Sequence, residues 1–437
     1  MSRKLLIKGG IVVCPAQNIE EKLDILIEGE RIIGLKKDIR DKEAKTLDVK
    51  GKLVTPGWID MHCHLREPGR EDIGTIESGS KSAAAGGYTS IACMPNTDPV
   101  VDNQMGIEYI LSRAKAVGFI HLLPIGALTK GLNGEELTEI STLVEAGAVA
   151  LSDDENSIMD SYLMRRALEY MTMFDIPIIA HCEDRNLSEE GCVNEGLVST
   201  MMGFRGIPSI AEEIMVSRDI ILTEFTQSRL HMAHVSTKAS VELIRKAKAE
   251  GVRVTSEVTP HHFTLTDTDI LESNYNTHFK VSPPLRSKED QHAVIEGLKD
   301  GTIDTIATDH NPWLDMEKDV EFIHAPFGII SIETALPLIF TRLITPKHLT
   351  LMEAIAKVTC NPAGILNLSK GTLSKGSVAD ITVIDPHMEL SITQDFFHSI
   401  SKNSPFIGQT MKGFAVYTLV EGEIVFDRHE NTFYKRH

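Results

Sequence analysis

The sequence lacks the features that mark nucleic-acid-binding, membrane-spanning and disulfide-stabilised proteins. It has no basic tract, and its 44 lysines and arginines against 62 aspartates and glutamates give a formal net charge of −18. This charge disfavours nucleic acid or an anionic membrane surface as a partner. No apolar run approaches the length of a membrane span. The six cysteines stand apart without a Cys-x-x-Cys pair, which is typical of reduced thiols in a cytoplasmic protein.

The two ends of the sequence are rich in short β-type runs and turns. Residues 4–53 alternate such runs with turns and show no helical period, and residues 372–427 behave in the same way. Both halves contain a Glu-Gly-Glu turn, at residues 28–30 and 421–423. We therefore expect residues 1–53 and 372–437 to form one small β-sandwich domain around a central domain of residues 54–371. A chain of 437 residues has room for a large barrel with such a module.

Between these flanks, apolar strand-like runs alternate with helix-like segments, which is the pattern of βα units and a parallel sheet. The candidate strands cover residues 54–62, 88–94, 120–126, 147–152, 177–181, 229–234, 252–258 and 303–308. The helix-like segments between them include residues 107–116, 161–174, 211–226 and 239–249. Eight such strands predict the α/β class and a (β/α)8 TIM-like barrel. Active sites of such barrels form at the C-terminal ends of the strands.

Five of the eight candidate strands end in histidine or aspartate. Taken singly, each such residue is more often a capping aspartate or a buried core histidine. That interpretation does not explain why so many of them meet at one rim. Four histidines with carboxylates suit zinc or a similar divalent ion, and two ions with a bridging carboxylate would use all of them. The residues concerned are His62 and His64, Asp153 and Asp154, His181, His234, and Asp309 with His310.

Several longer motifs carry a family resemblance. They are residues 60–69 (DMHCHLREPG), 94–97 (MPNT), 181–183 (HCE), 233–236 (AHVS), 258–262 (VTPHH), 282–286 (SPPLR), 307–310 (ATDH) and 325–328 (APFG). Together they resemble the cyclic amidohydrolases, and among them the dihydroorotase family. The resemblance runs from about residue 52 to about residue 376, and the flanking sandwich is also typical of that family.

The resemblance implies a reversible, zinc-dependent hydrolysis of a ring amide, with two Zn²⁺ per subunit and no other cofactor. Many relatives carry a bridging carboxylated lysine after the fourth strand, where this chain has aspartates instead. The offset of 27 residues before His181 favours Asp154 as the bridging ligand, with Asp153 as the alternative. Asp309 would act as general base and then as general acid. The implied ligands are His62, His64 and Asp309 for the more buried metal, and His181 and His234 for the second.

The implied substrates are dihydroorotate and N-carbamoyl-L-aspartate, which are intermediates of pyrimidine biosynthesis. Because these molecules are anions and the chain is acidic, a cationic contact is needed. Arg66, two residues after His64, offers a planar guanidinium to a carboxylate; the alternative is a rim salt bridge with Glu67 or Glu71. The further implied substrate contacts are Asn96, His262 with His261 as its alternative, Leu285, Ala325 and Gly328.

Four residues depart from the family pattern in ways that affect substrate contacts more than metal ligands: Glu155, Ser282, Asn311 and Trp313. Other functions stay open. The chain could be another cyclic amidase, such as an allantoinase or a hydantoinase (dihydropyrimidinase), or a non-catalytic dihydroorotase-like scaffold. Such scaffolds lose metal ligands, whereas this chain has them all. We expect a cytoplasmic enzyme with a small-molecule substrate, no nucleic-acid or membrane partner, and a homodimer as a reasonable assembly.

Overall fold

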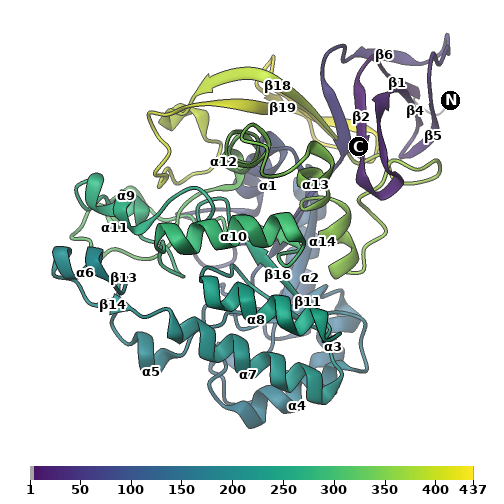
Figure 1. Cartoon of the computed structure of the whole chain (residues 1–437). Coiled ribbons are helices and arrows are strands. Elements are labelled where there is room, and N and C mark those ends of the chain that lie inside the picture. The colour runs from purple at the N-terminus through teal and green to yellow at the C-terminus, as the bar shows by residue number, and fades with distance from the viewer. Residues whose placement is uncertain (1–3, 437) are drawn as a thin grey trace.

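Eight parallel strands form a barrel at the centre of the molecule (Figure 1). The computed structural model describes residues 4–436. The strands follow one another around the sheet in chain order: β8 (Trp58–Cys63), β9 (Tyr88–Cys93), β10 (His121–Ala127), β11 (Ala150–Ser152), β12 (Ile178–Ala180), β15 (Leu230–Met232), β16 (Val254–Val258) and β17 (Thr305–Ile306). Each overlaps one predicted strand, so the predicted (β/α)8 barrel is confirmed.

Backbone hydrogen bonds between the first and last strands close the barrel at the edge that carries the predicted ligands. The N–H of His64 donates to the carbonyl of His310 at 2.8 Å, and the N–H of Asp309 donates to the carbonyl of His62 at 2.9 Å. The seam of the barrel and the candidate site are therefore built from the same residues.

Helices follow the strands and pack on the outside of the barrel (Figure 1). Polar side chains start several of them, because a side-chain oxygen accepts a hydrogen bond from an otherwise unpaired N–H of the first turn; Thr75, Asn103, Asp160, Thr237 and Ser287 do so. The barrel helices are α1 (Ile76–Gly86), α2 (Gln104–Val117), α3 (Ile140–Ala146), α4 (Ser161–Met171), α7 (Ile210–Thr226), α8 (Lys238–Ala249), α10 (Lys288–Asp300) and α12 (Ile332–Ile339).

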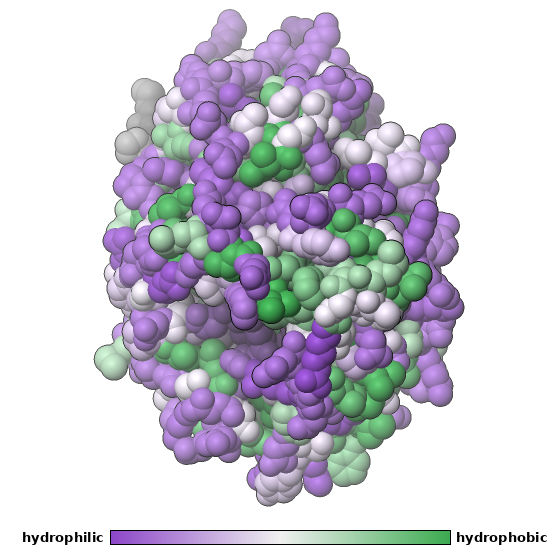
Figure 2. Space-filling model, turned by 90° about the vertical axis from the view of Figure 1, so that its left-hand side faces the viewer, coloured by the Kyte–Doolittle hydropathy of each residue, from purple (hydrophilic) through white to green (hydrophobic). Residues whose placement is uncertain are grey.

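Shorter elements lie in the connections. The segment after β12 contains α5 (Arg185–Ser188), β13 (Val193–Asn194), α6 (Leu197–Met202) and β14 (Gly206–Ile207), and the later connections contain α9 (Asp267–Glu272), α11 (Asp315–Lys318), α13 (Leu351–Ala356) and α14 (Cys360–Ile365). Figure 2 views the side of the molecule that carries α6, α9 and α11, and a hollow with mainly hydrophilic walls opens there. No helix within residues 4–436 is long and apolar enough to cross a membrane.

Two sheets from the ends of the chain form the small domain. One contains β1 (Lys4–Lys8), β4 (Asp24–Glu28), β5 (Arg31–Lys36) and β6 (Lys45–Asp48). The other contains β2 (Ile11–Cys14), β3 (Ile19–Lys22), β7 (Leu53–Pro56), β18 (Ile381–Ser391), β19 (Thr410–Val420), β20 (Glu423–Asp427) and β21 (Thr432–Phe433). Because β7 pairs with β2 and β18, the chain leaves the small domain at Gly57. The two Glu-Gly-Glu turns touch: a Cβ on Gly422 would lie 2.3 Å from the carbonyl oxygen of Gly29.

The connection between β18 and β19, residues 392–409, leaves the small domain and packs against the barrel. The buried side chain of Asn403 accepts a hydrogen bond from the N–H of Trp313 at 3.2 Å. Its Nδ2 donates to the carbonyls of Asn311 at 3.1 Å and Gly328 at 3.2 Å. A residue assigned by sequence to the small domain thus supports the loop that follows β17.

Candidate metal centre and substrate pocket

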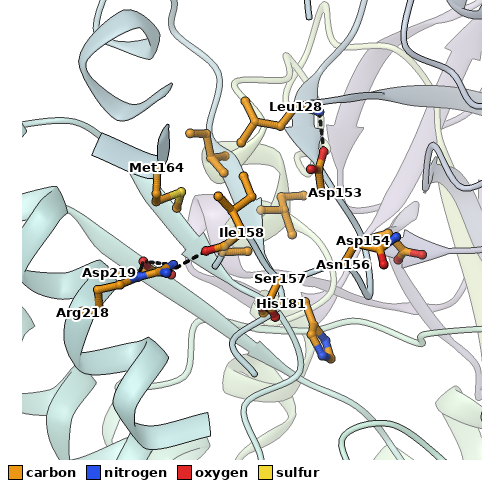
Figure 3. A pocket seen from close by; sticks show the side chains of 13 residues that line it. Leu128, Asp153, Asp154, Asn156, Ser157, Ile158, Met164, His181, Arg218 and Asp219 are labelled. Carbon is orange, nitrogen blue, oxygen red and sulfur yellow. Dashed lines mark hydrogen bonds and ion pairs between the residues drawn. The ribbon is translucent and has the colours of Figure 1, made fainter. Parts of the chain in front are cut away.

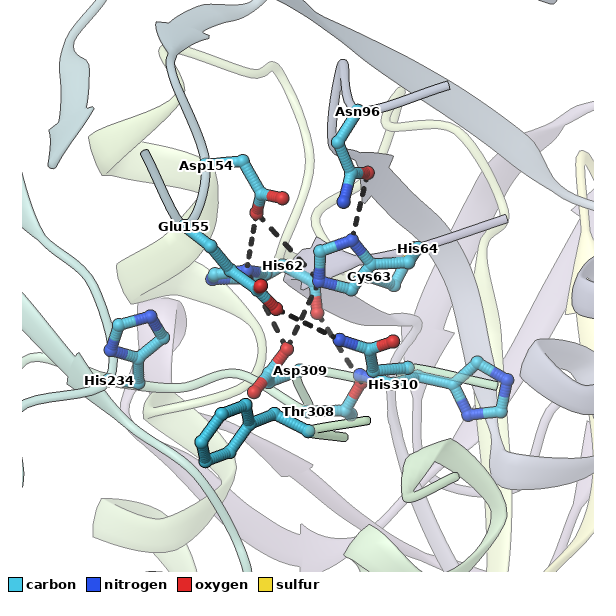
Figure 4. Close-up of polar contacts among 12 residues, drawn as sticks. His62, Cys63, His64, Asn96, Asp154, Glu155, His234, Thr308, Asp309 and His310 are labelled. Carbon is cyan, nitrogen blue, oxygen red and sulfur yellow. Dashed lines mark hydrogen bonds and ion pairs between the residues drawn. The ribbon is translucent and has the colours of Figure 1, made fainter. Parts of the chain in front are cut away.

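Two histidines and two aspartates converge where β8, β11 and β17 end (Figure 4). Nε2 of His62 lies 3.6 Å from Oδ1 of Asp154 and 3.7 Å from Oδ1 of Asp309. Nε2 of His64 lies 3.8 Å and 3.2 Å from the same two oxygens. All four side chains are buried. The fold therefore gathers two imidazole nitrogens and two carboxylate oxygens around one point.

Hydrogen bonds on the far side of each imidazole set its orientation. Nδ1 of His62 lies 2.9 Å from Oε1 of Glu257, and Nδ1 of His64 lies 3.0 Å from Oδ1 of Asn96. Burial opposes ionisation of Glu257, but hydrogen bonds from His231 and His62 lower the pKa of its carboxyl to about 2. Both oxygens accept, so each imidazole carries a hydrogen on Nδ1 and turns its Nε2 towards the aspartates.

The other two predicted histidines form a second pair beside the first. Nδ1 of His181 and Nε2 of His234 lie 3.0 Å apart, and both side chains are buried. The rings of His62 and His234 are 5.3 Å apart between centroids, which joins the two pairs into one cluster. Nε2 of His181 lies 3.7 Å from the carboxylate of Glu183, so its Nδ1 is the atom that faces His234.

The neighbouring carboxylates after β11 point in different directions (Figure 3). Oδ1 of Asp153 accepts hydrogen bonds from the N–H groups of Leu128 at 3.0 Å and Thr129 at 2.8 Å, and its Oδ2 accepts from the Thr129 hydroxyl. Asp154 instead faces His62 and His64. The structure thus places Asp154, and not Asp153, among the candidate ligands. A cavity of about 20 Å³, the size of one water, lies beside both aspartates and His181.

The donor set fits a divalent cation. Within the described residues, Oδ1 of Asp154 and Nδ1 of His234 are buried without a hydrogen-bond partner, although buried polar atoms are normally paired. His62, His64 and Asp154 offer ligand atoms that all lie within 4.8 Å of one another. Imidazole nitrogens with carboxylate oxygens are the ligands of zinc and similar ions.

The backbone is strained at several of these positions. The φ angles are 66° at Arg66, 53° at Asp154, 30° at His234 and 47° at Asp309. Each such angle costs a residue with a side chain about 1–3 kcal/mol, so it persists only where the surrounding fold imposes it. Strain of this kind concentrated at the strand ends is typical of a functional site.

Arg66 lies at this site and not in a surface ion pair. Its Nε donates to the carbonyl of Pro312 at 3.2 Å, its Nη2 donates to Oδ1 of Asn311, and its Cζ lies 4.6 Å from the centre of the Trp313 ring. The alternative salt bridge is wrong. Glu67 pairs with Arg113 at 2.7 Å, and Glu71 accepts from the N–H of Gly69.

The other predicted substrate residues have part of their polar groups already engaged within the protein. Nδ1 of His262 lies 2.7 Å from the Thr259 hydroxyl and its Nε2 lies 3.0 Å from the carbonyl of Pro283. Burial lowers the pKa of His262 to about 4, so the ring is neutral at pH 7. The N–H groups of Ala325 and Gly328 donate to the carbonyls of Glu321 and Lys280, and Leu285 is buried. Asn96 bonds His64 through Oδ1, which leaves its Nδ2 as a donor.

Sequence reasoning missed three supporting residues. Glu257 holds His62, Asn403 holds the loop after β17, and the buried carboxylate of Asp60 accepts from the N–H and the hydroxyl of Thr308 at 2.8 Å and 2.6 Å. Two of them could have been found from the sequence: Glu257 and Asp60 are charged residues inside predicted buried strands, where a charge needs a partner. Asn403 stands in a loop, and nothing in the sequence marks it as a supporting residue.

Solved structures and a family model define the class of protein. An L-hydantoinase (dihydropyrimidinase) from Arthrobacter aurescens superposes with a TM-score of 0.87 and 26% sequence identity, over 98% of this chain and 97% of that one. A dihydropyrimidinase from Brevibacillus agri NCHU1002 shares the fold, with a TM-score of 0.84 and 23% identity over 99% and 97% of the two chains. The family model described as "Amidohydrolase family" matches residues 223–426. With the site above, these matches define a metal-dependent type of hydrolase that acts on cyclic amides.

Sequence relatives then identify the family within this class. The model described as "Dihydro-orotase-like" matches residues 51–240. Dihydroorotases from Acetivibrio thermocellus and Pelotomaculum thermopropionicum are each 53% identical to the chain, over 96% and 97% of it and 98% of their own lengths. The chain belongs to the dihydroorotase family, and the expected resemblance is confirmed.

Proposed function

We propose that the chain is a dihydroorotase that interconverts dihydroorotate and N-carbamoyl-L-aspartate in the cytoplasm, as a step of de novo pyrimidine biosynthesis. The observation that carries this proposal is the half-buried guanidinium of Arg66, held by the loop that follows the ligand Asp309. A ring amide held at the cluster would leave a carboxylate on the same ring within reach of that cation. Curated relatives of the same family at 53% identity support the same substrate.

The proposed cofactor is Zn²⁺, with two ions per subunit. His62, His64 and Asp309 would hold the more buried ion, His181 and His234 would hold the second, and Asp154 would serve both. When bound, such ions lower the pKa of water and polarise a carbonyl group. With this chemistry, the proposed hydrolysis would need no other cofactor.

Asp309 has the position of the proton carrier. Its Oδ1 lies 3.2 Å from Nε2 of His64, at the centre of the cluster. Its carboxylate would take the proton of the attacking water and deliver it to the ring nitrogen as the amide bond breaks. In the cyclisation direction, the same carboxylate would take the proton from the carbamoyl nitrogen. Arg66 would bind the substrate carboxylate, and Nδ2 of Asn96 could donate a further hydrogen bond.

A second candidate is a hydantoinase or dihydropyrimidinase activity, which the structural similarity to the Arthrobacter aurescens enzyme favours. An allantoinase and a non-catalytic scaffold are further alternatives. A substrate panel of dihydroorotate, dihydrouracil, hydantoin and allantoin separates these functions. We expect turnover of dihydroorotate, loss of that turnover after chelation, recovery with Zn²⁺, and about two zinc ions per chain by elemental analysis. Turnover of dihydrouracil or allantoin without dihydroorotate would select a different cyclic amidase, and a metal-free inactive chain would select the scaffold.

The remaining proposals concern partners. The acidic charge favours small-molecule substrates over nucleic acid or membrane partners. A homodimer is the assembly we propose, because closed twofold dimers are the commonest oligomers of soluble enzymes. Light scattering of the purified chain gives its mass in solution, and 48.3 kDa would mark a monomer.

A further inference from the structure

The guanidinium of Arg66 is held on one edge and one face. Its Nε and Nη2 form the side-on edge, and both donate to the loop after β17, to the carbonyl of Pro312 and to Oδ1 of Asn311. The indole of Trp313 covers one face at 4.6 Å. Within residues 4–436, the hydrogen bonds of Arg66 are donated by Nε and Nη2, and Nη1 donates none. The end-on edge of the guanidinium is therefore the part left for a ligand.

The amide of Asn311 links this cation to an anion. Its Nδ2 donates to Oε1 of Glu155 at 3.2 Å, while its Oδ1 accepts from Arg66. A guanidinium only donates and a carboxylate only accepts, so the two partners allow one orientation of the amide. The backbone of Gly328 also packs closely against this amide, since a Cβ on the glycine would lie 2.5 Å from Cγ of Asn311. Asn311 is itself 2% exposed.

We propose that Asn311 and Glu155 are specificity-determining positioning residues, which with Trp313 hold Arg66 so that its end-on edge accepts a substrate carboxylate. This inference rests on the proposed dihydroorotase function and adds to it the residues that select a carboxylate-bearing ring. Glu155 acts through Asn311, since its carboxylate orients the amide whose oxygen holds Arg66. Neither residue supplies a ligand atom to the cluster of His62 and His64.

Loss of the Asn311 amide leaves the charge of Arg66 in place, but only the carbonyl of Pro312 and the ring of Trp313 then hold its plane. A guanidinium held less firmly still attracts an anion, yet it loses part of the paired, parallel hydrogen bonding that makes an arginine–carboxylate contact strong. The contact between Asp309 and His64 is not part of this chain of hydrogen bonds. The expected signature is therefore weaker substrate binding with nearly unchanged turnover.

The first test is Asn311→Ala in the zinc-loaded enzyme. We expect KM for dihydroorotate to rise about tenfold while kcat stays within about threefold. The dissociation constant of orotate, which keeps the ring carboxylate and is not hydrolysed, should rise by a similar factor in calorimetry. Glu321→Gln, an exposed carboxylate-to-amide change on the same loop, is the matched control and should behave as wild type. A fall in kcat with unchanged KM, or an unchanged dissociation constant for orotate, would overturn the proposal.

The second test is a double-mutant cycle, whose Glu155 variants still test the proposal if Asn311→Ala does not fold. Glu155→Ala should raise KM for dihydroorotate and the dissociation constant of orotate in the same way. Glu155→Gln keeps an oxygen for the Asn311 amide, so it should restore most of the affinity. The double variant should be no worse than Asn311→Ala alone, because both changes break one chain of contacts. Additive effects, or no rescue by glutamine, would contradict the coupling. A wild-type enzyme that does not use dihydroorotate would instead refute the proposed function.

Discussion

At the scale of single residues, Asp153 and Asp154 show how backbone conformation assigns roles to identical side chains. Asp153 directly follows β11, and its carboxylate accepts from the N–H groups of Leu128 and Thr129. Asp154 has a φ of 53°, which reverses the chain and aims its carboxylate at His62 and His64. Burial raises the pKa of Asp153 to about 6, although the hydrogen bonds that its carboxylate accepts act to lower this pKa. Of these two aspartates, Asp154 is the one with a buried oxygen that lacks a hydrogen-bond partner.

The same substitution at these two neighbours should have opposite outcomes. Asp154→Asn replaces a ligand carboxylate with a neutral amide, so zinc content should fall and kcat/KM should drop by about 10³ or more. Asp153→Asn keeps an oxygen for both N–H donors, and the Thr129 hydroxyl can reverse its role. We expect normal zinc content and near-normal activity for that variant. Elemental analysis and initial rates check both, and equal zinc loss in the two variants would contradict the assignment.

At the scale of elements, the connection between β18 and β19 supports a loop of the barrel. Asn403 is fully buried and bonds the backbone of Asn311, Trp313 and Gly328 through both ends of its amide. Asn311 and Trp313 both contact Arg66, so the position of the candidate carboxylate contact depends on a segment from the small domain.

Removal of the Asn403 amide should therefore affect both stability and binding. Asn403→Ala breaks three hydrogen bonds and leaves buried backbone groups unpaired, which should lower the free energy of unfolding by about 2–3 kcal/mol. Asn403→Asp has the same shape but turns a carboxylate oxygen towards two carbonyls, so it should destabilise at least as much. Urea unfolding and KM for dihydroorotate measure the effects. Lys412→Ala, an exposed change on β19, is the control, and an Asn403→Asp variant as stable as wild type would disprove this account.

At the scale of the whole molecule, Asp380 joins the barrel to the small domain. It is 6% exposed, and its carboxylate lies 3.3 Å from Nε2 of His121 on β10 and 2.5 Å from Nζ of Lys370. Its own carbonyl accepts from Gly57, where the chain passes from β7 to β8. Burial alone would raise the pKa of the Asp380 carboxyl, but hydrogen bonds and charges from His121 and Lys370 hold it well below its usual range.

This lowered pKa predicts how stability depends on pH. An aspartate with a folded-state pKa below its unfolded value of about 3.9 stabilises the fold above that pH, and the contribution is lost as the pH falls towards the folded value. Asp380→Asn should therefore cost about 3 kcal/mol at pH 7, because a buried ion pair loses its anion. The difference from wild type should shrink below about pH 4. Denaturant unfolding at pH 7 and pH 3.5 measures it, and a difference independent of pH would show that the charge is unimportant.

Much of the fold and the site could be predicted because short stretches of the sequence carry the pattern of each strand, helix and strand end. The alternation of apolar runs with helical periods determines the eight barrel strands, and the residues that end those strands include all the candidate ligands. His62, His64, His181, His234 and Asp309 need no tertiary information beyond the rule that parallel strands end at one rim. The eight longer motifs together likewise indicate the family.

Only the tertiary structure decided the rest, because contacts between distant segments leave no periodic signal. The choice of Asp154 over Asp153 depends on a left-handed backbone conformation after β11, where the two-residue alternation of a strand no longer applies. The assignment of β7 to the small domain depends on its pairing with β18, more than 300 residues later. The support of Arg66 by Asn311 and of Asn311 by Asn403 depends on which loops meet, and that is set by packing of the whole chain.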